Sequence, residues 1–116
     1  MRTLDVAWER AKILRDWRIW GRRIAQTARI ALGQDLVGVY VFGSVVKDEA
    51  VACSDVDLLI VAKKLPGSHI ERSEIKLKIM DSAGLPSVHP FEIHLVDEEE
   101  AVAYFRHIGE ALMRIE

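Results

Sequence analysis

The sequence predicts an α/β (α+β) fold in which helices flank a small mixed β-sheet, in the order α-β-α-β-α-β-α. Segments 36–42 (LVGVYVF) and 56–62 (VDLLIVA) are short, β-branched and almost wholly apolar, as strands buried on both faces are. Segments with helical periodicity or helix-capping residues surround them. The 116 residues suffice for one hydrophobic core, so we expect a single domain over residues 1–116.

The first predicted element is a long amphipathic helix. Between Leu4 and Leu32 apolar side chains recur mostly at every third or fourth position, with arginines between them. Gly21 is a possible break and Gly33 a candidate C-cap. The segment carries three tryptophans, which we expect to pack against the sheet, with an oligomer interface as the alternative: Trp8, Trp17 and Trp20.

A second long helix is predicted after the 56–62 strand. The LPGS segment at 65–68 is typical of a turn, and Ser68 with Glu71 matches a capping box. We expect this helix to run to about Ala83 and to stop at Gly84.

A third strand and a last helix are predicted near the C-terminal end. In segment 91–96 (FEIHLV) apolar residues alternate with Glu92, His94 and Val96, which would share the opposite face. Asp97 and Glu100 match the cap and third position of a helix whose acidic first turn suits the helix dipole. His94 could line a cleft or be an ordinary half-exposed histidine, and we do not count it as a ligand.

Composition excludes several classes of protein. Half of the residues are apolar and 29% are charged, as in ordinary globular domains rather than disordered or fibrous chains. No apolar run approaches the roughly 18 residues of a membrane span, and Asp5, Glu9 and Arg10 stand where a signal peptide would be apolar. Cys53 is the only cysteine, which excludes an internal disulfide and a cysteine-based zinc site. We expect a cytoplasmic protein.

Charge is unevenly distributed along the chain. Residues 1–33 carry eight basic and three acidic side chains, whereas residues 84–116 carry two and seven. The two ends could attract each other, pair with a partner, or be two solvated helix faces. Because the overall pI is about 6.1 and acids are interleaved with the arginines, we do not expect nucleic-acid binding.

Two carboxylates mark the start of the second strand. Asp55 and Asp57 are two residues apart, so their side chains should project from the same face. Such close carboxylates repel each other, and Val56 between them offers no cation. Oxygen ligands favour a hard cation such as Mg²⁺ or Mn²⁺, whose open positions would accept the phosphates of a nucleoside triphosphate.

A Gly-Ser pair follows the first strand, at Gly43 and Ser44. We expect these residues to begin a short helix whose backbone N–H groups and Ser44 hydroxyl point at an anion. Glycine would let the backbone approach a phosphate closely. A Gly-Ser pair alone is common in turns, so its meaning depends on the acidic pair one strand later.

Together, Gly43-Ser44, ten intervening residues, and Asp55-Val56-Asp57 followed by an apolar strand resemble the signature of the DNA polymerase β-like nucleotidyltransferase superfamily. The short chain resembles its minimal nucleotidyltransferases, which occur beside helical HEPN proteins in toxin-antitoxin pairs. The resemblance extends over nearly the whole order of elements.

The resemblance implies roles for five residues. Asp55 and Asp57 would hold Mg²⁺ (or Mn²⁺), and Glu92 would be the third acid, which binds a second metal and helps to activate an acceptor hydroxyl. The structural alternative for Glu92 is an edge-strand residue that faces water. Gly43 and Ser44 would bind the β- and γ-phosphates of ATP or another nucleoside triphosphate.

Two positions depart from the pattern of close relatives. A basic residue commonly follows the Gly-Ser pair, where this chain has Val45, and Gly often stands where this chain has Asp48. A missing cation and an added acid are expected to weaken triphosphate binding. Lys47 retains one positive charge and is a candidate phosphate contact, with a solvated surface lysine as the alternative.

The resemblance implies metal-dependent transfer of a nucleoside monophosphate, AMP from ATP in the first instance, to an acceptor such as a protein partner, with release of pyrophosphate. The alternative is an antitoxin-type binding module that neutralises a HEPN toxin with little or no catalysis. Because larger relatives place a second domain over the cleft, we expect acceptor recognition to come from a HEPN-type helical partner or a homo-oligomer.

Overall fold

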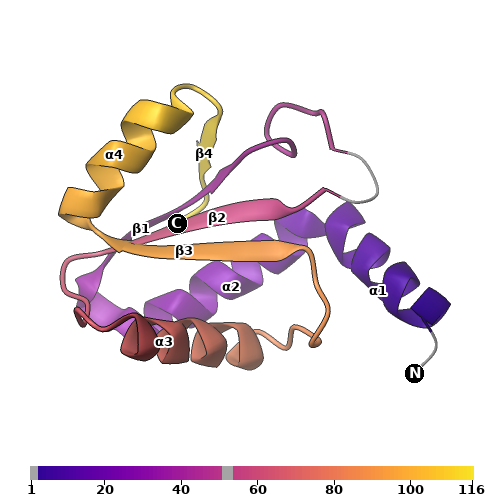
Figure 1. Cartoon of the computed structure of the whole chain (residues 1–116), viewed down its shortest axis with the longest axis horizontal. Helices are drawn as coiled ribbons and strands as arrows, with labels where there is room; N and C mark the ends of the chain where they lie inside the picture. The colour runs from indigo at the N-terminus through magenta and orange to yellow at the C-terminus, as the bar shows by residue number, and fades with distance from the viewer. Residues whose placement is uncertain (1–2, 51–53) are drawn as a thin grey trace.

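A computed structural model describes residues 3–50 and 54–116 as one sheet with helices on both faces (Figure 1). Helices α2 and α3 cover one face, α4 covers the other, and α1 extends beyond the end of the sheet. Cys53 lies outside the described residues. The elements, in chain order, are α1 (Thr3–Arg15), α2 (Trp17–Leu32), the 3-10 turn η1 (Gly33–Asp35), β1 (Leu36–Phe42), β2 (Val56–Ala62), α3 (His69–Ser82), β3 (Phe91–Asp97), α4 (Glu98–Ile108) and β4 (Leu112–Arg114).

The sheet is mixed, with the strand order β3-β2-β1-β4. β1 pairs antiparallel with β2 and with β4, and β2 pairs in parallel with β3. The predicted fold class is therefore confirmed, and the strands expected at 36–42 and 56–62 have those bounds. β4 was not predicted, because it is only three residues long and forms by pairing with β1.

The central strand β2 is apolar because both of its faces are covered. Val56, Leu58 and Ile60 belong to the larger core, which they share with α2 and α3. Leu59 and Val61 belong to a smaller core under α4. β2 thus carries buried side chains on alternating faces, as a continuous apolar run predicts.

The N-terminal helical segment is interrupted at a different place from the one predicted. The break lies at Asp16, whose carbonyl accepts hydrogen bonds from the N–H groups of Ile19 and Trp20. Gly21 lies inside α2 and is buried. The sequence offered no break signal at Asp16, because neither glycine nor proline stands there.

The tryptophans divide between core and surface. Trp17 is 7% exposed and belongs to the larger core, and Trp20 packs against the same core, as predicted. Trp8 is 63% exposed, so the expectation that it packs against the sheet was wrong.

The segment after Gly43 also differs from the prediction. Instead of a short helix, residues 44–48 form hydrogen-bonded turns, in which the Gly43 carbonyl accepts from Val46 N–H and the Ser44 carbonyl accepts from Glu49 N–H.

The predicted N-terminal caps of α3 and α4 are both present. Ser68 accepts from Glu71 N–H, and Asp97 with Glu100 forms a complete capping box at the start of α4.

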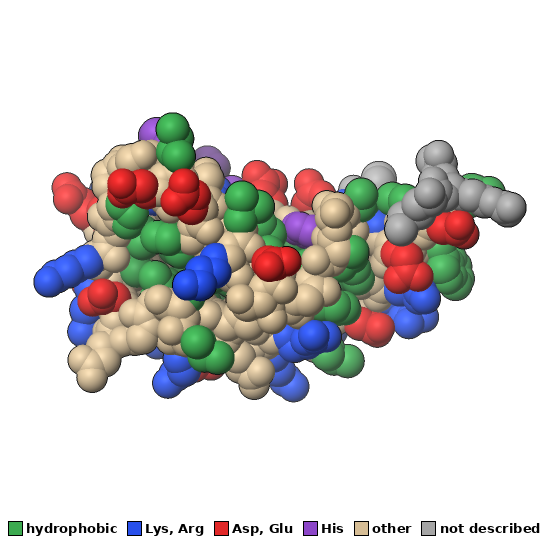
Figure 2. All heavy atoms as spheres, turned by 90° about the horizontal axis from the view of Figure 1, so that it is seen from below, with side chains coloured by type: hydrophobic (Ala, Val, Ile, Leu, Met, Phe, Trp, Pro, Cys, Tyr) green, Lys and Arg blue, Asp and Glu red, His purple; other side chains and the backbone are tan. Residues whose placement is uncertain are grey.

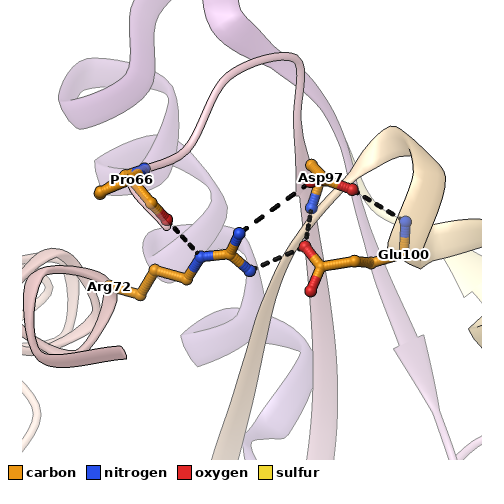
Figure 3. A network of polar contacts seen from close by, with 4 residues as sticks. All are labelled: Pro66, Arg72, Asp97 and Glu100. Carbon is orange, nitrogen blue, oxygen red and sulfur yellow. Dashed lines mark hydrogen bonds and ion pairs between the residues drawn. The ribbon is translucent and has the colours of Figure 1, made fainter. Parts of the chain in front are cut away.

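An arginine joins α3 to the start of α4 (Figure 3). Arg72 donates from Nε to the Pro66 carbonyl at 2.7 Å and from Nη1 to Glu100 Oε1 at 2.7 Å. The Asp97 backbone N–H and then the Arg72 side chain, as donors to the Glu100 carboxylate, lower its pKa. This network fixes the two helices that border the exposed side of β3.

Among the described residues, no helix combines the length and apolarity needed to cross a membrane.

Candidate active site

The sheet register places the predicted acids next to each other. Asp57 on β2 is paired with Phe42 on β1 and with Glu92 on β3, so the three residues form one row across the sheet. Gly43 follows Phe42 directly. Segments separated by many residues in the sequence therefore meet where β1 ends and β2 and β3 begin.

Asp57, Glu92 and His94 form a cluster of possible metal ligands. One ligand atom from each residue lies within 4.8 Å of the others. The side chains of Asp57 and His94 are 26% and 24% exposed, and Glu92 is exposed. The cluster is on the same face as the α4 core, beyond the apolar residues that α4 covers.

Glu92 lies on an edge strand, because β3 pairs with β2 alone among the strands that the structure describes. Glu92 is exposed, as expected for the structural alternative of an edge residue that faces water. The cost of burying a charge therefore does not argue for a functional role of this acid. Its position directly opposite Asp57 is the feature that gives it chemical interest.

Asp55 has a different environment from Asp57. Its carboxylate accepts a 2.9 Å charged hydrogen bond from Arg10 Nη2 on α1, and Arg10 also donates to the Ser54 carbonyl at 3.0 Å. Asp55 is not part of the ligand cluster found among the described residues. The positive charge expected beside the acidic pair is thus supplied to Asp55 by a side chain 45 positions away, which no local spacing could reveal.

Gly43 is adjacent to the Asp57 carboxylate. Its φ of +93° favours glycine, and a Cβ built there would lie 2.8 Å from Asp57 Oδ2. Glycine therefore leaves the space that the carboxylate occupies. Ser44 is half-buried and Lys47 is exposed, so both remain candidates for contact with a phosphate.

The two departures from the pattern of relatives have structural reasons. Val45 is 6% exposed and belongs to the larger core, so an apolar side chain at this position stabilises the turn after β1. Asp48 has a φ of +58°, a left-handed conformation that glycine adopts readily and aspartate tolerates better than most residues.

His94 is closer to the predicted acids than the sequence indicated. Its Nε2 lies 3.4 Å from Asp57 Oδ1, and its Nδ1 lies 3.4 Å from the Tyr104 hydroxyl on α4. Sequence reasoning placed His94 on the face of Glu92 but did not identify Tyr104, because the position of α4 over β3 depends on tertiary packing.

A groove of about 340 Å³ opens beside the cluster, between α3, β3 and α4. Its charged and polar lining includes Arg72 and Lys76 from α3, Glu92 and His94 from β3, and Tyr104 from α4. Groups of both charge signs thus stand within reach of a molecule bound there.

The donors present fit a divalent cation. Asp57 and Glu92 supply two anionic oxygens, and His94 supplies a nitrogen when neutral. Asp55 could add a third carboxylate only by exchanging its hydrogen bond with Arg10 for the metal.

The order of elements and the mixed sheet are those of the nucleotidyltransferase fold. The Polymerase beta, Nucleotidyltransferase family matches residues 26–108, and the chain belongs to this family.

A protein of Methanocaldococcus jannaschii, proposed to be a protein adenylyltransferase, is 42% identical to this chain over 50 residues. Those residues are 43% of this chain and 34% of the relative, so the match spans about a third of the relative's length.

Three solved structures share the fold. A proposed nucleotidyltransferase from Sulfolobus solfataricus aligns over 96% of this chain and 83% of its own, with a TM-score of 0.60 and 16% identity. A second proposed nucleotidyltransferase aligns over 78% and 91%, with a TM-score of 0.58 and 25% identity. A toxin-antitoxin with AMP-PNP aligns over 80% and 70%, with a TM-score of 0.54 and 18% identity.

Proposed function

We propose that the protein transfers a nucleoside monophosphate, AMP from ATP, to a protein acceptor and releases pyrophosphate. The observation that carries this proposal is the pairing of Asp57 with Glu92 across β2 and β3, beside Gly43, which directly follows β1. Two carboxylates in this arrangement are suited to the metal-assisted in-line displacement that nucleotidyl transfer requires.

In this mechanism Asp57 and Glu92 would hold Mg²⁺ or Mn²⁺, and Asp55 would join them by exchanging its hydrogen bond with Arg10 for the metal. When bound, the metal would supply the positive charge that orients the triphosphate and stabilises charge in the transition state. Glu92 accepts the proton of the acceptor hydroxyl, whose oxygen forms a bond to the α-phosphorus. The bond from that phosphorus to the oxygen bridging to the β-phosphate breaks, and pyrophosphate leaves with the electron pair.

The turn after β1 is the proposed site for the leaving phosphates. Gly43 offers close backbone approach, the Ser44 hydroxyl can donate to a phosphate oxygen, and Lys47 can pair with the terminal phosphate. Because Val45 belongs to the core rather than to the phosphate site, we expect weaker triphosphate binding than in relatives with a basic residue there.

The groove beside the cluster is the proposed path of the acceptor. It reaches Glu92 and His94 from the side opposite β2, and α3 and α4 border it. A single hydroxyl-bearing side chain on an exposed segment could enter such a groove, which is consistent with a protein acceptor. The Methanocaldococcus jannaschii relative supports AMP and a protein as the two reactants.

A second candidate function is an antitoxin-type binding module for a HEPN-type partner. The observation that favours it is the apolar surface of α1, where Leu4 is 81% and Trp8 is 63% exposed. Partner binding and AMP transfer are compatible, because binding could deliver the acceptor residue to the groove.

Nucleic acid is a poorer candidate for the partner. On the face seen in Figure 2, Lys and Arg side chains are mixed with Asp and Glu rather than gathered into one patch. Two arginines of the basic N-terminal segment lie over tryptophan rings, Arg18 on Trp17 and Arg23 on Trp20. A mixed surface gives little of the phosphate attraction on which such binding depends.

The test is transfer of label from α-³²P-ATP to protein in a lysate of the source cells, with Mg²⁺ or Mn²⁺ added. Wild type is expected to label one acceptor, and Asp57→Asn is expected to reduce the rate more than about 100-fold. Asp81→Asn, which alters an exposed acid on α3, is the matched control and should retain activity. Equal labelling by wild type and Asp57→Asn would contradict the enzyme, and a partner retained by both without labelling would favour the binding module.

A further inference from the structure

We propose that His94 is a metal ligand together with Asp57 and Glu92. Its imidazole nitrogen would make the metal site at this cluster selective for Mn²⁺ over Mg²⁺. The inference rests on the proposed function for the existence of a metal at the cluster. It goes beyond that function by adding a ligand of different chemistry to a site otherwise made of oxygens.

The geometry of the cluster places the imidazole with the acids. His94 Nε2 is 3.4 Å from Asp57 Oδ1, and the ligand atoms of the whole cluster lie within 4.8 Å of one another. Neighbouring ligands of one octahedral ion are about 3 Å apart, so small side-chain shifts would bring all three to a common ion. Asp55, in contrast, is held by Arg10 on α1.

The other side of the ring is arranged as metal-bound histidines usually are. Nδ1 faces the Tyr104 hydroxyl at 3.4 Å, leaving Nε2 to face the acids. The ring also packs against Phe42 at 5.4 Å and Tyr104 at 5.5 Å between centroids. These contacts orient Nε2 before any ion binds.

The donor set has a chemical consequence for metal choice. Mg²⁺ prefers oxygen ligands and retains its waters, whereas Mn²⁺, although it also suits oxygen ligands, is a first-row transition ion and binds imidazole nitrogen more readily than Mg²⁺ does. Two carboxylates and a neutral imidazole also match the charge of a divalent ion. A nitrogen ligand should therefore strengthen Mn²⁺ binding while leaving Mg²⁺ binding almost unchanged.

The experiment uses Mn²⁺ alone as the probe, with the full chain and no nucleotide. Electron paramagnetic resonance gives the Mn²⁺ dissociation constant, competition gives the constant for Mg²⁺, and spin-echo modulation detects a directly bound ¹⁴N. For His94→Gln we expect a Kd for Mn²⁺ raised about tenfold, a Kd for Mg²⁺ changed less than about twofold, and loss of the ¹⁴N signal. His107→Gln, an exposed histidine on α4, is the control.

Tyr104→Phe provides a second variant that leaves the imidazole in place. It removes the hydroxyl near Nδ1, and we expect a several-fold weaker Mn²⁺ affinity with the ¹⁴N signal retained. If His94 were only a hydrogen-bond partner of Asp57, no ¹⁴N signal would appear in the wild type.

The outcomes separate this inference from the proposed function. If Asp57→Asn abolishes Mn²⁺ binding but His94→Gln does not weaken it, His94 is not a ligand and the metal site stands. If neither Asp57→Asn nor Glu92→Gln weakens Mn²⁺ binding, the metal site of the proposed function fails as well.

Discussion

The two faces of the sheet differ in how far their apolar covering extends. On the face covered by α2 and α3, the β2 residues Val56, Leu58 and Ile60 are all fully buried. On the other face α4 covers Leu59 and Val61, whereas Asp57, two residues earlier, is partly exposed. β2 thus contributes apolar side chains to the core through one face. On its other face it carries Asp57, at the point where the covering by α4 ends.

The largest expected effect is a difference in the free energy of unfolding between substitutions on the two faces of β2. Leu58→Ala should lower the free energy of unfolding by about 3 kcal/mol, because it opens a cavity at a fully buried position. Asp57→Asn, one residue away on the other face, should change it by less than about 1 kcal/mol. Urea denaturation measures both values, and a larger loss for Asp57→Asn than for Leu58→Ala would contradict the comparison.

Gly43→Ala tests the contact between the two strands at the site. A Cβ would lie 2.8 Å from Asp57 Oδ2 at a φ of +93°, so we expect a loss of about 2 kcal/mol together with weaker metal binding. Gly67→Ala is the matched control, because no atom lies within 4 Å of a Cβ there, and it should be nearly neutral. Calorimetric unfolding and Mn²⁺ titration measure both variants. Equal effects of the two substitutions would contradict a specific contact between Gly43 and the Asp57 carboxylate.

Arg10→Ala tests the difference between the two aspartates. The ion pair is largely exposed on the Asp55 side, so stability should fall by less than about 1 kcal/mol. Because the guanidinium occupies the carboxylate that a metal would use, Mg²⁺ and Mn²⁺ should bind several-fold more tightly to the variant. Arg15→Ala, which removes an exposed pair with Asp16, is the control. Unchanged metal affinity in a titration of Arg10→Ala would place Asp55 outside the metal site.

The smallest expected effect concerns pH and the helix that borders the groove. The pKa of Glu100 lies below its ordinary value of 4.5 in the folded chain, chiefly through the Asp97 N–H and Arg72. Its contribution to stability is therefore complete above about pH 4.5 and is lost as the pH falls through the lower, folded-state pKa. Glu100→Gln should flatten the acid side of the stability profile, measured by urea denaturation from pH 6 to pH 3. A profile parallel to that of wild type would contradict this.

The sequence predicted the elements whose signals are local. β1 and β2 were placed correctly because dense apolar, β-branched runs have few alternatives. The capping residues Asp97 and Glu100 were identified because a cap depends on residues three apart. Glu92 lies opposite Asp57 on the neighbouring strand, and its role as the third acid stays a prediction.

The features that were missed depend on contacts distant in sequence. Arg10 meets Asp55 across 45 positions, and Tyr104 meets His94 only because α4 folds back over β3. The break at Asp16 and the strand β4 likewise follow from packing and pairing rather than from breaker or strand residues. Local sequence patterns therefore identified the acids. The different surroundings of Asp55 and Asp57 became visible only in the folded structure.

The most direct measurement of the central claim is the anomalous scattering of Mn²⁺ in a crystal of the protein grown with a non-hydrolysable ATP analogue. The proposed function predicts an anomalous peak bonded to Asp57 and Glu92, with the triphosphate against Gly43 and Ser44. An ordered nucleotide with no Mn²⁺ at Asp57 and Glu92, or with its phosphates on another surface, would contradict it.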